Sequence, residues 1–234
     1  MNFRELCQTL KTEAGIPGPP GSPLTVVGQT GELGRVVNWI QQSWLDIQSM
    51  HNSWRFMRHG FQFVLTPSTR SYTKAAVKAA AGLTHDINRY HCHTLRLYLA
   101  SEGIATEQEL SYVPVWDDFR DTRLVGAWHT TTGRPRFFSV DPQDRLVFDL
   151  LPDAAYTVYG DYQREPANFP ASDIATPDFP AYLHMIIVWN ALIRYAGFEE
   201  SSAQYTHARN MYATLMARME DRELEQMMPP CPLV

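Results

Sequence analysis

The chain has 234 residues, with 20 Lys and Arg against 25 Asp and Glu, a formal net charge of −5 at pH 7. Hydrophobic residues make up 44% and aromatic residues 12% of the chain, which is enough to bury a sizeable core and excludes a mostly disordered protein. The acidic balance argues against a protein whose main task is to grip nucleic acid, because phosphate binding depends on Lys and Arg.

The three cysteines are far apart and form no CxxC pair, so neither a disulfide framework nor a zinc ribbon is indicated. The first turn carries Arg4 and Glu5 in place of an apolar segment, and we expect no signal peptide. The longest apolar stretch, residues 185–193, is far below the ~20 residues that span a bilayer. We therefore expect synthesis in a reducing cytosol and no membrane partner.

Four helices are predicted from apolar residues that recur every three or four positions. They are expected over residues 2–13, 31–54, 180–196 and 200–225. The segment 15–23 contains four prolines and three glycines and predicts an extended loop. Residues 183–193 are apolar on almost every side, so we expect this part of the third helix to be covered on several faces.

Strands are predicted for the middle of the chain. Apolar and polar residues alternate at 61–65, and 95–99 is a further candidate strand, although a helix is also compatible there. Residues 137–140 and 146–150, joined by a turn, predict a hairpin, with 156–162 as the third strand of an antiparallel meander.

These elements define the expected fold class, which is α+β and mainly α. We expect a helical-bundle core with a small antiparallel β-region, about 61–163, inserted between the N-terminal and C-terminal helices.

Three glycines mark the start of the second helix. Gly28, Gly31 and Gly34 have the spacing GxxGxxG, whereas the dinucleotide fingerprint needs GxGxxG and a following βαβ unit. No lysine follows at the offset of a phosphate loop either. We therefore predict a tight turn into the helix, with Thr30 as its N-cap.

Four possible metal ligands, His85, Asp86, His91 and His93, stand within nine residues. On a strand His91 and His93 would share one face, which would suit zinc. No third ligand or acidic general base follows at a recognisable spacing, so we expect structural histidines and no metal, cofactor or catalytic residue. A metal-dependent hydrolase that uses these four residues is the alternative from the enzyme class.

The segment 227–234 is apolar, uncharged and rich in proline. Proline favours an extended conformation and lowers the entropy cost of docking, while methionine adapts to irregular pockets. The segment is either a terminus without fixed structure or a docking segment. In the second case the partner-binding residues are Met227, Met228, Pro229, Pro230, Cys231, Pro232, Leu233 and Val234.

Taken in order, these features resemble the head-to-tail adaptor (connector) proteins of tailed bacteriophages. The resemblance starts with a short helix, a Gly/Pro loop and the sequence TVVGQTGE at 25–32. It continues with VNWI at 37–40, WRFM at 54–57 and a β-rich block at 135–162 that contains LVFDLLP. The closing helices, over residues 182–219, match the family in order and spacing.

The resemblance implies a structural virion protein with a single adaptor domain, 1–226, and an extended C-terminal tail, 227–234. It implies a ring, usually a dodecamer, that docks on the portal protein by this tail and receives a tail or neck protein on its other face. DNA would cross the ring's channel without sequence readout. Such a protein lies in the virion neck after synthesis in the bacterial host cytoplasm.

Within that ring we expect residues 183–193 to belong to the core and the 31–54 helix to contribute to subunit contacts. A tail terminator or stopper of the neck is the alternative within the same class of proteins.

Overall fold

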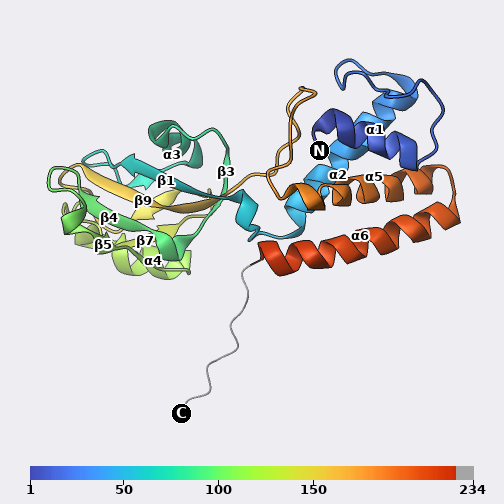
Figure 1. The fold of residues 1–234 in the computed structure, drawn as a ribbon. Helices are drawn as coiled ribbons and strands as arrows, with labels where there is room; N and C mark the ends of the chain where they lie inside the picture. The colour runs from blue at the N-terminus through green and yellow to red at the C-terminus, as the bar shows by residue number, and fades with distance from the viewer. Residues whose placement is uncertain (225–234) are drawn as a thin grey trace, which may run out of the picture. The chain divides into compact units, whose positions relative to one another are not determined.

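The computed structural model describes residues 1–224, which divide into two compact units (Figure 1). The helical unit holds residues 1–57 and the chain from residue 166 onward, and the β unit holds residues 58–165. The expected fold class, α+β and mainly α with an inserted β-region, is confirmed. No helix within residues 1–224 is both long enough and apolar enough to cross a membrane.

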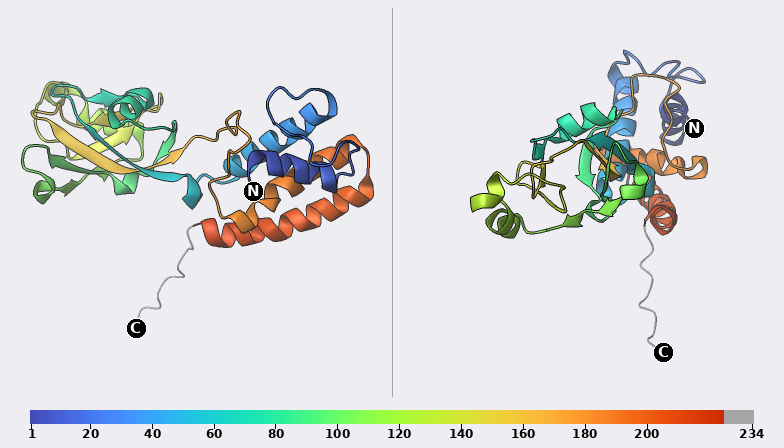
Figure 2. Two further views of the ribbon diagram at one scale, coloured as in Figure 1. Left: turned by 45° about the horizontal axis from the view of Figure 1, so that its top comes forward. Right: turned by 90° about the vertical axis from the view of Figure 1, so that its left-hand side faces the viewer.

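Four α-helices form the helical unit: α1 (Phe3–Glu13), α2 (Gly31–Met50), α5 (Met185–Phe198) and α6 (Ser202–Glu223). Asn2 and Glu5 cap the start of α1 reciprocally, each side chain accepting from the other residue's backbone N–H. Helix α5 contacts the other three helices, and α6 runs alongside it (Figures 1 and 2). The apolar α5 is therefore covered on several faces, as its sequence predicts.

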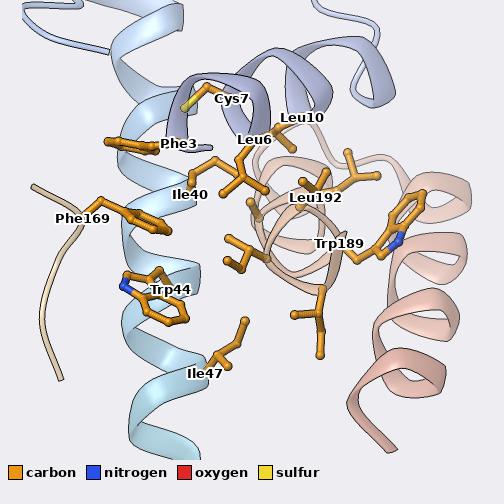
Figure 3. Close-up of a cluster of buried hydrophobic side chains, with 14 of the residues drawn as sticks. Phe3, Leu6, Cys7, Leu10, Ile40, Trp44, Ile47, Phe169, Trp189 and Leu192 are labelled. Carbon is orange, nitrogen blue, oxygen red and sulfur yellow. The ribbon is translucent and has the colours of Figure 1, made fainter. Parts of the chain in front are cut away.

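The core of the helical unit is drawn in Figure 3. Side chains from α1, α2 and α5 point into it, among them Leu6, Ile40 and Leu192. Phe169, from the segment that follows the β unit, stacks between Phe3 at 4.8 Å and Trp44 at 5.2 Å, measured between ring centroids. The segment that returns from the β unit is thus anchored in the helical core.

Two glutamines of α2 also hold this segment. The Gln48 side chain donates to the carbonyl of Ala167 at 2.9 Å and accepts from its N–H at 3.2 Å. Gln41 forms the same pair of bonds with Phe169, at 3.3 and 2.9 Å. The two amides therefore replace a neighbouring β-strand for residues 167–169, and we call this arrangement the glutamine clamp.

Two helix boundaries differ from the prediction by more than two residues. Helix α2 ends at Met50 rather than at residue 54, because buried Trp54 folds back and its indole N–H donates to the carbonyl of Ile47 at 2.8 Å. Pro180 precedes a short 3₁₀ turn, Ala181–Leu183, and α5 begins only at Met185.

Nine strands and two helices make up the β unit, and the elements in chain order are as follows. They are β1 (Arg58–Val64), β2 (Ser71–Tyr72), α3 (Lys74–Ala81), β3 (Ile87–Tyr90), β4 (Arg96–Leu99), β5 (Gln108–Glu109), β6 (Ser111–Tyr112), α4 (Trp116–Arg123), β7 (Phe137–Val140), β8 (Leu146–Phe148) and β9 (Tyr156–Arg164).

The strands form two sheets around a second hydrophobic core. One sheet has the order β1-β9-β4-β5, with β3 also paired to β9, and the other has the order β2-β8-β7-β6. Residues 96–99, for which a helix was also compatible, are a strand. Phe63 of the first sheet and Phe148 of the second both contact the ring of Tyr72, with centroids 5.3 and 6.0 Å away.

The hairpin of β7 and β8 is confirmed, but the predicted meander is wrong. The Asp141 carboxylate closes the hairpin turn by accepting from the N–H groups of Gln143 and Arg145 at 3.0 and 2.8 Å. Strand β9 belongs to the other sheet, where it pairs with β1 on one side and with β3 and β4 on the other. Seven of its nine residues are buried, and a central position in a sheet satisfies such a strand better than the edge of a meander.

Candidate interaction surfaces

An aromatic surface of the helical unit is formed by Arg35, Trp39 and Phe198. Arg35 and Trp39 lie one turn apart on α2, and Phe198 is the last residue of α5. The Arg35 guanidinium lies 4.8 Å from the centre of the Phe198 ring, and the Trp39 ring lies 5.9 Å from it. Phe198 is 56% exposed. Aromatic and arginine side chains of this kind dominate the energetics of protein interfaces.

Two exposed apolar loops of the same unit are fastened together. The Asp173 carboxylate accepts from the N–H of Val26 at 2.7 Å and from the Thr25 hydroxyl at 3.1 Å. Leu24 and Ile174 lie on these loops, and each is 77% exposed. The carboxylate therefore holds an exposed apolar side chain on each loop in a fixed position, which suits a contact with a partner.

At the C-terminal end of α6, the Arg222 side chain donates to the Tyr182 hydroxyl at 2.6 Å. Its guanidinium also lies 5.4 Å from the centre of the Tyr182 ring, which is largely exposed. The chain leaves α6 next to this pair. The predicted docking residues 227–234 lie outside the described residues.

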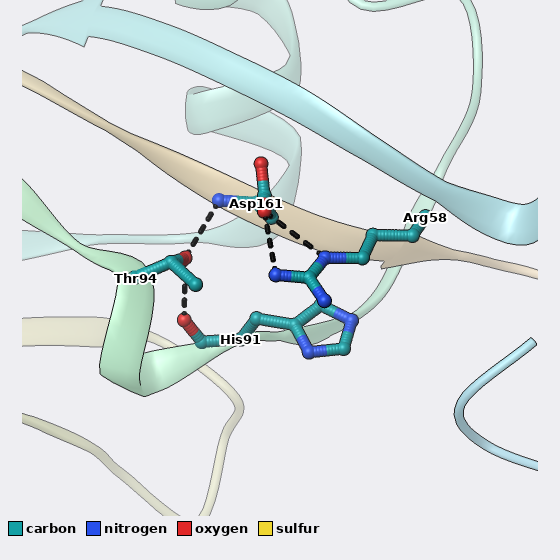
Figure 4. Close-up of polar contacts among 4 residues, drawn as sticks. All are labelled: Arg58, His91, Thr94 and Asp161. Carbon is teal, nitrogen blue, oxygen red and sulfur yellow. Dashed lines mark hydrogen bonds and ion pairs between the residues drawn. The ribbon is translucent and has the colours of Figure 1, made fainter. Parts of the chain in front are cut away.

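A polar network joins three segments of the β unit (Figure 4). The Arg58 guanidinium donates twice to the Asp161 carboxylate, at 3.0 and 2.8 Å. Asp161 donates its N–H to the Thr94 hydroxyl, and the hydroxyl donates to the carbonyl of His91 at 2.8 Å. The N–H of His91 donates in turn to the carbonyl of Asp161 at 2.9 Å. The network fixes the loop between β3 and β4 against β9.

A hollow of about 550 Å³ borders this network. Its lining includes Gly60 and Gln62 of β1, Leu83 after α3, and Thr94, Arg96 and Asp161. Gly60 has no side chain, and an added Cβ would meet its first neighbours only at 3.8 and 3.9 Å. The hollow therefore has room for a side chain from outside.

The histidine cluster of the sequence does not assemble into one site. His91 precedes a 3₁₀ turn, Cys92–Thr94, and His93 lies within it. The turn forms because the hydroxyl and the N–H of Thr94 both donate to the carbonyl of His91. They do not lie on a strand, so the shared face does not form. The His85 ring stacks on His59 at 5.2 Å, and Asp86 pairs with a lysine of α3. Within residues 1–224 no three His, Cys, Asp or Glu side chains are placed to hold a metal ion.

The glycine segment forms the predicted turn into α2. Gly28 and Gly31 have φ values of 68° and 61°, which favour glycine. Thr30 occupies the N-cap position but its side chain makes no cap bond. At Gly34 a Cβ would lie 2.9 Å from the carbonyl oxygen of Gln29, so the glycine permits a close approach of two backbone segments.

Burial makes two of the cysteines unreactive. Desolvation raises the pKa of the Cys7 thiol to about 12, and the negative charge of Asp173 acts in the same direction. Desolvation also raises the pKa of Cys92. Since the thiolate is the nucleophilic form, neither thiol is activated for catalysis. Asp117, Asp118 and Asp121 lie on the exposed face of α4, where Asp117 and Asp121 pair with Arg120.

Sequence reasoning missed two features of these surfaces. The predicted third helix stops at residue 196, whereas α5 continues to Phe198. The aromatic residue after Gly197 was the available signal that the helix goes on. It also missed Gln41 and Gln48, whose seven-residue spacing places them on one face of α2.

Exposed apolar side chains such as Leu24, Ile174 and Phe198 are typical of a protein that contacts other proteins in an assembly. Compared with known protein families, the chain matches the SU10 adaptor protein family over residues 1–231. The chain belongs to this family, and its resemblance to phage head-to-tail adaptors is confirmed. No curated protein matches the chain at a significant level. The family supports a structural role as a bacteriophage adaptor in the virion neck.

Proposed function

We propose that the protein is a ring-forming head-to-tail adaptor that docks on the portal and joins the capsid to the tail. In this proposal residues 1–226 act as one adaptor domain, copies of which form a ring, usually a dodecamer. The observation that carries it is the match to an adaptor family over residues 1–231. The portal protein and the next tail or neck protein are its partners.

Ring closure requires a contact between two unlike faces of neighbouring subunits. A stable contact of this kind buries about 800 Å² on each partner. The aromatic surface of Arg35, Trp39 and Phe198 supports this role, because two of its residues lie on α2, the helix expected to contribute to subunit contacts. Its exposed Phe198 supplies the apolar area at the centre of such a contact.

The C-terminal segment 227–234 docks into the portal in this proposal. The segment carries no charged residue and three prolines, so it binds at a low cost in conformational entropy and without desolvating a charge. DNA crosses the ring without sequence readout. The net charge of −5 agrees with passage, because a strongly basic channel would hold the phosphates and slow ejection.

The experiment mixes the purified chain with portal rings and images the product by electron microscopy. A chain that ends at residue 226 should fold normally, because the deleted residues 227–234 belong to neither described core. It should fail to dock on the portal. Phe198→Ser should dock but leave incomplete rings. Met211→Ser, at an exposed position of α6 away from the aromatic surface, is the control and should behave as the full chain does.

Two results would contradict this proposal. If the shortened chain decorates portal rings as the full chain does, residues 227–234 are not the docking segment. If the full chain binds the tail tube and ignores the portal, the protein is a tail terminator or stopper.

A further inference from the structure

A ring contact of the kind proposed above joins the aromatic surface of one copy to a different surface of the next copy. The two fastened loops of the helical unit carry a second surface, which we call the loop surface and define by Leu24, Asp173 and Ile174. Leu24 and Ile174 are each 77% exposed, and the Asp173 carboxylate holds their loops together. The loop surface is therefore apolar, carries one carboxylate and is fixed in position before any partner binds.

The loop surface and the aromatic surface lie near opposite ends of α5. The N–H of Arg4, in the first turn of α1, donates to the carbonyl of Asp173. Met1, just before this turn, lies 2.8 Å from Nδ1 of His184, the residue that precedes α5. Phe198 is the last of the 14 residues of α5, so about 20 Å of helix lies between His184 and the aromatic surface. One copy therefore presents both surfaces at once, as a head-to-tail contact requires.

The two surfaces also lie on different faces of α2. The glutamine clamp holds residues 167–169, which lead toward the loop surface, against the face of α2 that carries Gln48. Trp39 precedes Gln48 by nine residues, which is two and a half helical turns, so it lies on the opposite face. A neighbouring copy can thus reach each surface from a different side.

Each surface carries a charge that has no ionic partner within its own copy. Arg35 is exposed, and among residues 1–224 it forms no ion pair, not even with Glu32 one turn earlier on α2. Oδ1 of Asp173 accepts both bonds from the other loop, and no Lys, Arg or His of the described residues pairs with this carboxylate. The cation and the carboxylate are complementary, and a charge pair between two proteins fixes their register. The segment 227–234 carries no charged side chain that could serve Asp173 in this way.

We propose that the loop surface binds the aromatic surface of the neighbouring copy, with Arg35 donating to the Asp173 carboxylate across the contact. Leu24 and Ile174 then pack against the Phe198 ring, and this apolar contact excludes water from the charged pair. The inference rests on the proposed ring and names the residues of its repeating contact. Because the two sides of the contact differ, it repeats from copy to copy until the ring closes.

The first test replaces Phe198 by the photo-crosslinking residue p-benzoylphenylalanine in the full chain. Isotope-labelled and unlabelled copies are mixed on portal rings and irradiated, and mass spectrometry then separates links between copies from links within one copy. We expect links between copies from position 198 to residues 24–27 and 172–175. The same replacement at Met211, an exposed position of α6, is the control and should give no such links.

The second test is a double-mutant cycle between Arg35 and Asp173. Asp173→Asn keeps an oxygen for the bonds from Thr25 and Val26 but removes the charge, and Arg35→Gln removes the opposite charge. Each should raise the chain concentration that half-completes the rings by about ten-fold, since it leaves the other charge unpaired in the contact. The double variant should need about the same concentration as either single variant, because both changes remove one contact. Arg218→Gln, at an exposed position of α6, is the control and should change nothing.

Circular dichroism and thermal unfolding show whether each variant keeps its fold, and the crosslinks decide alone if a variant unfolds. Complete rings in which position 198 links to other parts of a neighbour, or to the portal, overturn the inference and leave the proposed function intact. Additive effects of Arg35→Gln and Asp173→Asn also overturn it, because the two charges then do not meet. If the natural chain forms no ring on the portal, the proposed function fails and the inference fails with it.

Discussion

Two glycines within helices have opposite surroundings, and this decides the effect of replacing them. Alanine is worth about 1 kcal/mol over glycine in an open helix interior. At Gly197 nothing lies within 4 Å of an added Cβ, so Gly197→Ala should raise the free energy of unfolding by about 0.5–1 kcal/mol. At Gly34 the Cβ would lie 2.9 Å from a backbone oxygen, so Gly34→Ala should lower the free energy of unfolding although alanine has the better helix propensity. Urea unfolding of both variants measures the signs, and a stabilised Gly34→Ala would contradict the close approach.

His184 is a buried histidine whose two ring nitrogens both have partners. Nε2 lies 2.9 Å from the carbonyl of Phe179, and Nδ1 lies 2.8 Å from the backbone nitrogen of Met1. Nδ1 also lies 3.0 Å from the carbonyl oxygen of Met1. Because the partner of Nε2 is a carbonyl oxygen, which only accepts, Nε2 carries a proton and donates it to Phe179. Desolvation lowers the pKa of His184 below its ordinary 6.5, and the positive charge at Met1 acts in the same direction while Glu5 opposes it.

This lowered pKa predicts sensitivity to acid. Below about pH 6.5 the unfolded chain binds a proton at His184 that the folded chain does not, so the contribution of His184 to the free energy of unfolding falls as the pH decreases. Above that pH the ring is neutral in both states, and its contribution is constant. His184→Gln removes the titrating group and should flatten this part of the profile in urea unfolding between about pH 8 and pH 5. His129→Gln, at an exposed position, is the control. If the free energy of unfolding changes equally with pH in both variants, the pKa of His184 is not lowered by folding.

At the scale of elements, the glutamine clamp on α2 shows how a helix can hold an extended segment. Gln48 is 1% exposed, so its amide is held inside the unit, where it bonds to the backbone of the exposed Ala167. Gln48→Leu would remove both bonds, and we expect it to lower the free energy of unfolding by about 1–3 kcal/mol, at about 0.5–1.5 kcal/mol for each bond.

The neighbouring Gln42 is exposed, and Gln42→Leu should change the stability little. Urea unfolding compares the two variants, and amide exchange at Ala167 should accelerate only in Gln48→Leu. Equal stability of the two variants would mean that the clamp contributes nothing to the fold.

Helices were predictable where a periodic apolar face coincided with a capping signal. Residues 3–13 are one example, with the Asn2 and Glu5 capping box at the start of α1. The end of α2 was not predictable, because Trp54 continues the apolar pattern but is buried by folding back onto Ile47. Strand β9 was predicted as a strand, but its partners were not, since pairing with β1 joins residues about a hundred positions apart in the sequence.

At the scale of the whole molecule, the sequence predicted the fold class and the insertion of the β-region, because helical and alternating patterns occupy separate blocks of the chain. The family could be inferred from the order of those blocks, without a catalytic motif. The interaction surfaces could not, since Arg35 and Phe198 are brought together only by the packing of α2 and α5.

The β unit begins at Arg58 and ends just after Gln163, and these two residues are direct neighbours in the β1–β9 ladder. A stretch of about a hundred residues is therefore inserted into the helical unit, and both of its ends lie on adjacent strands. Recombination between phage genomes could exchange this stretch for another of any length without rerouting the helical chain, provided that the replacement also starts and finishes on adjacent strands.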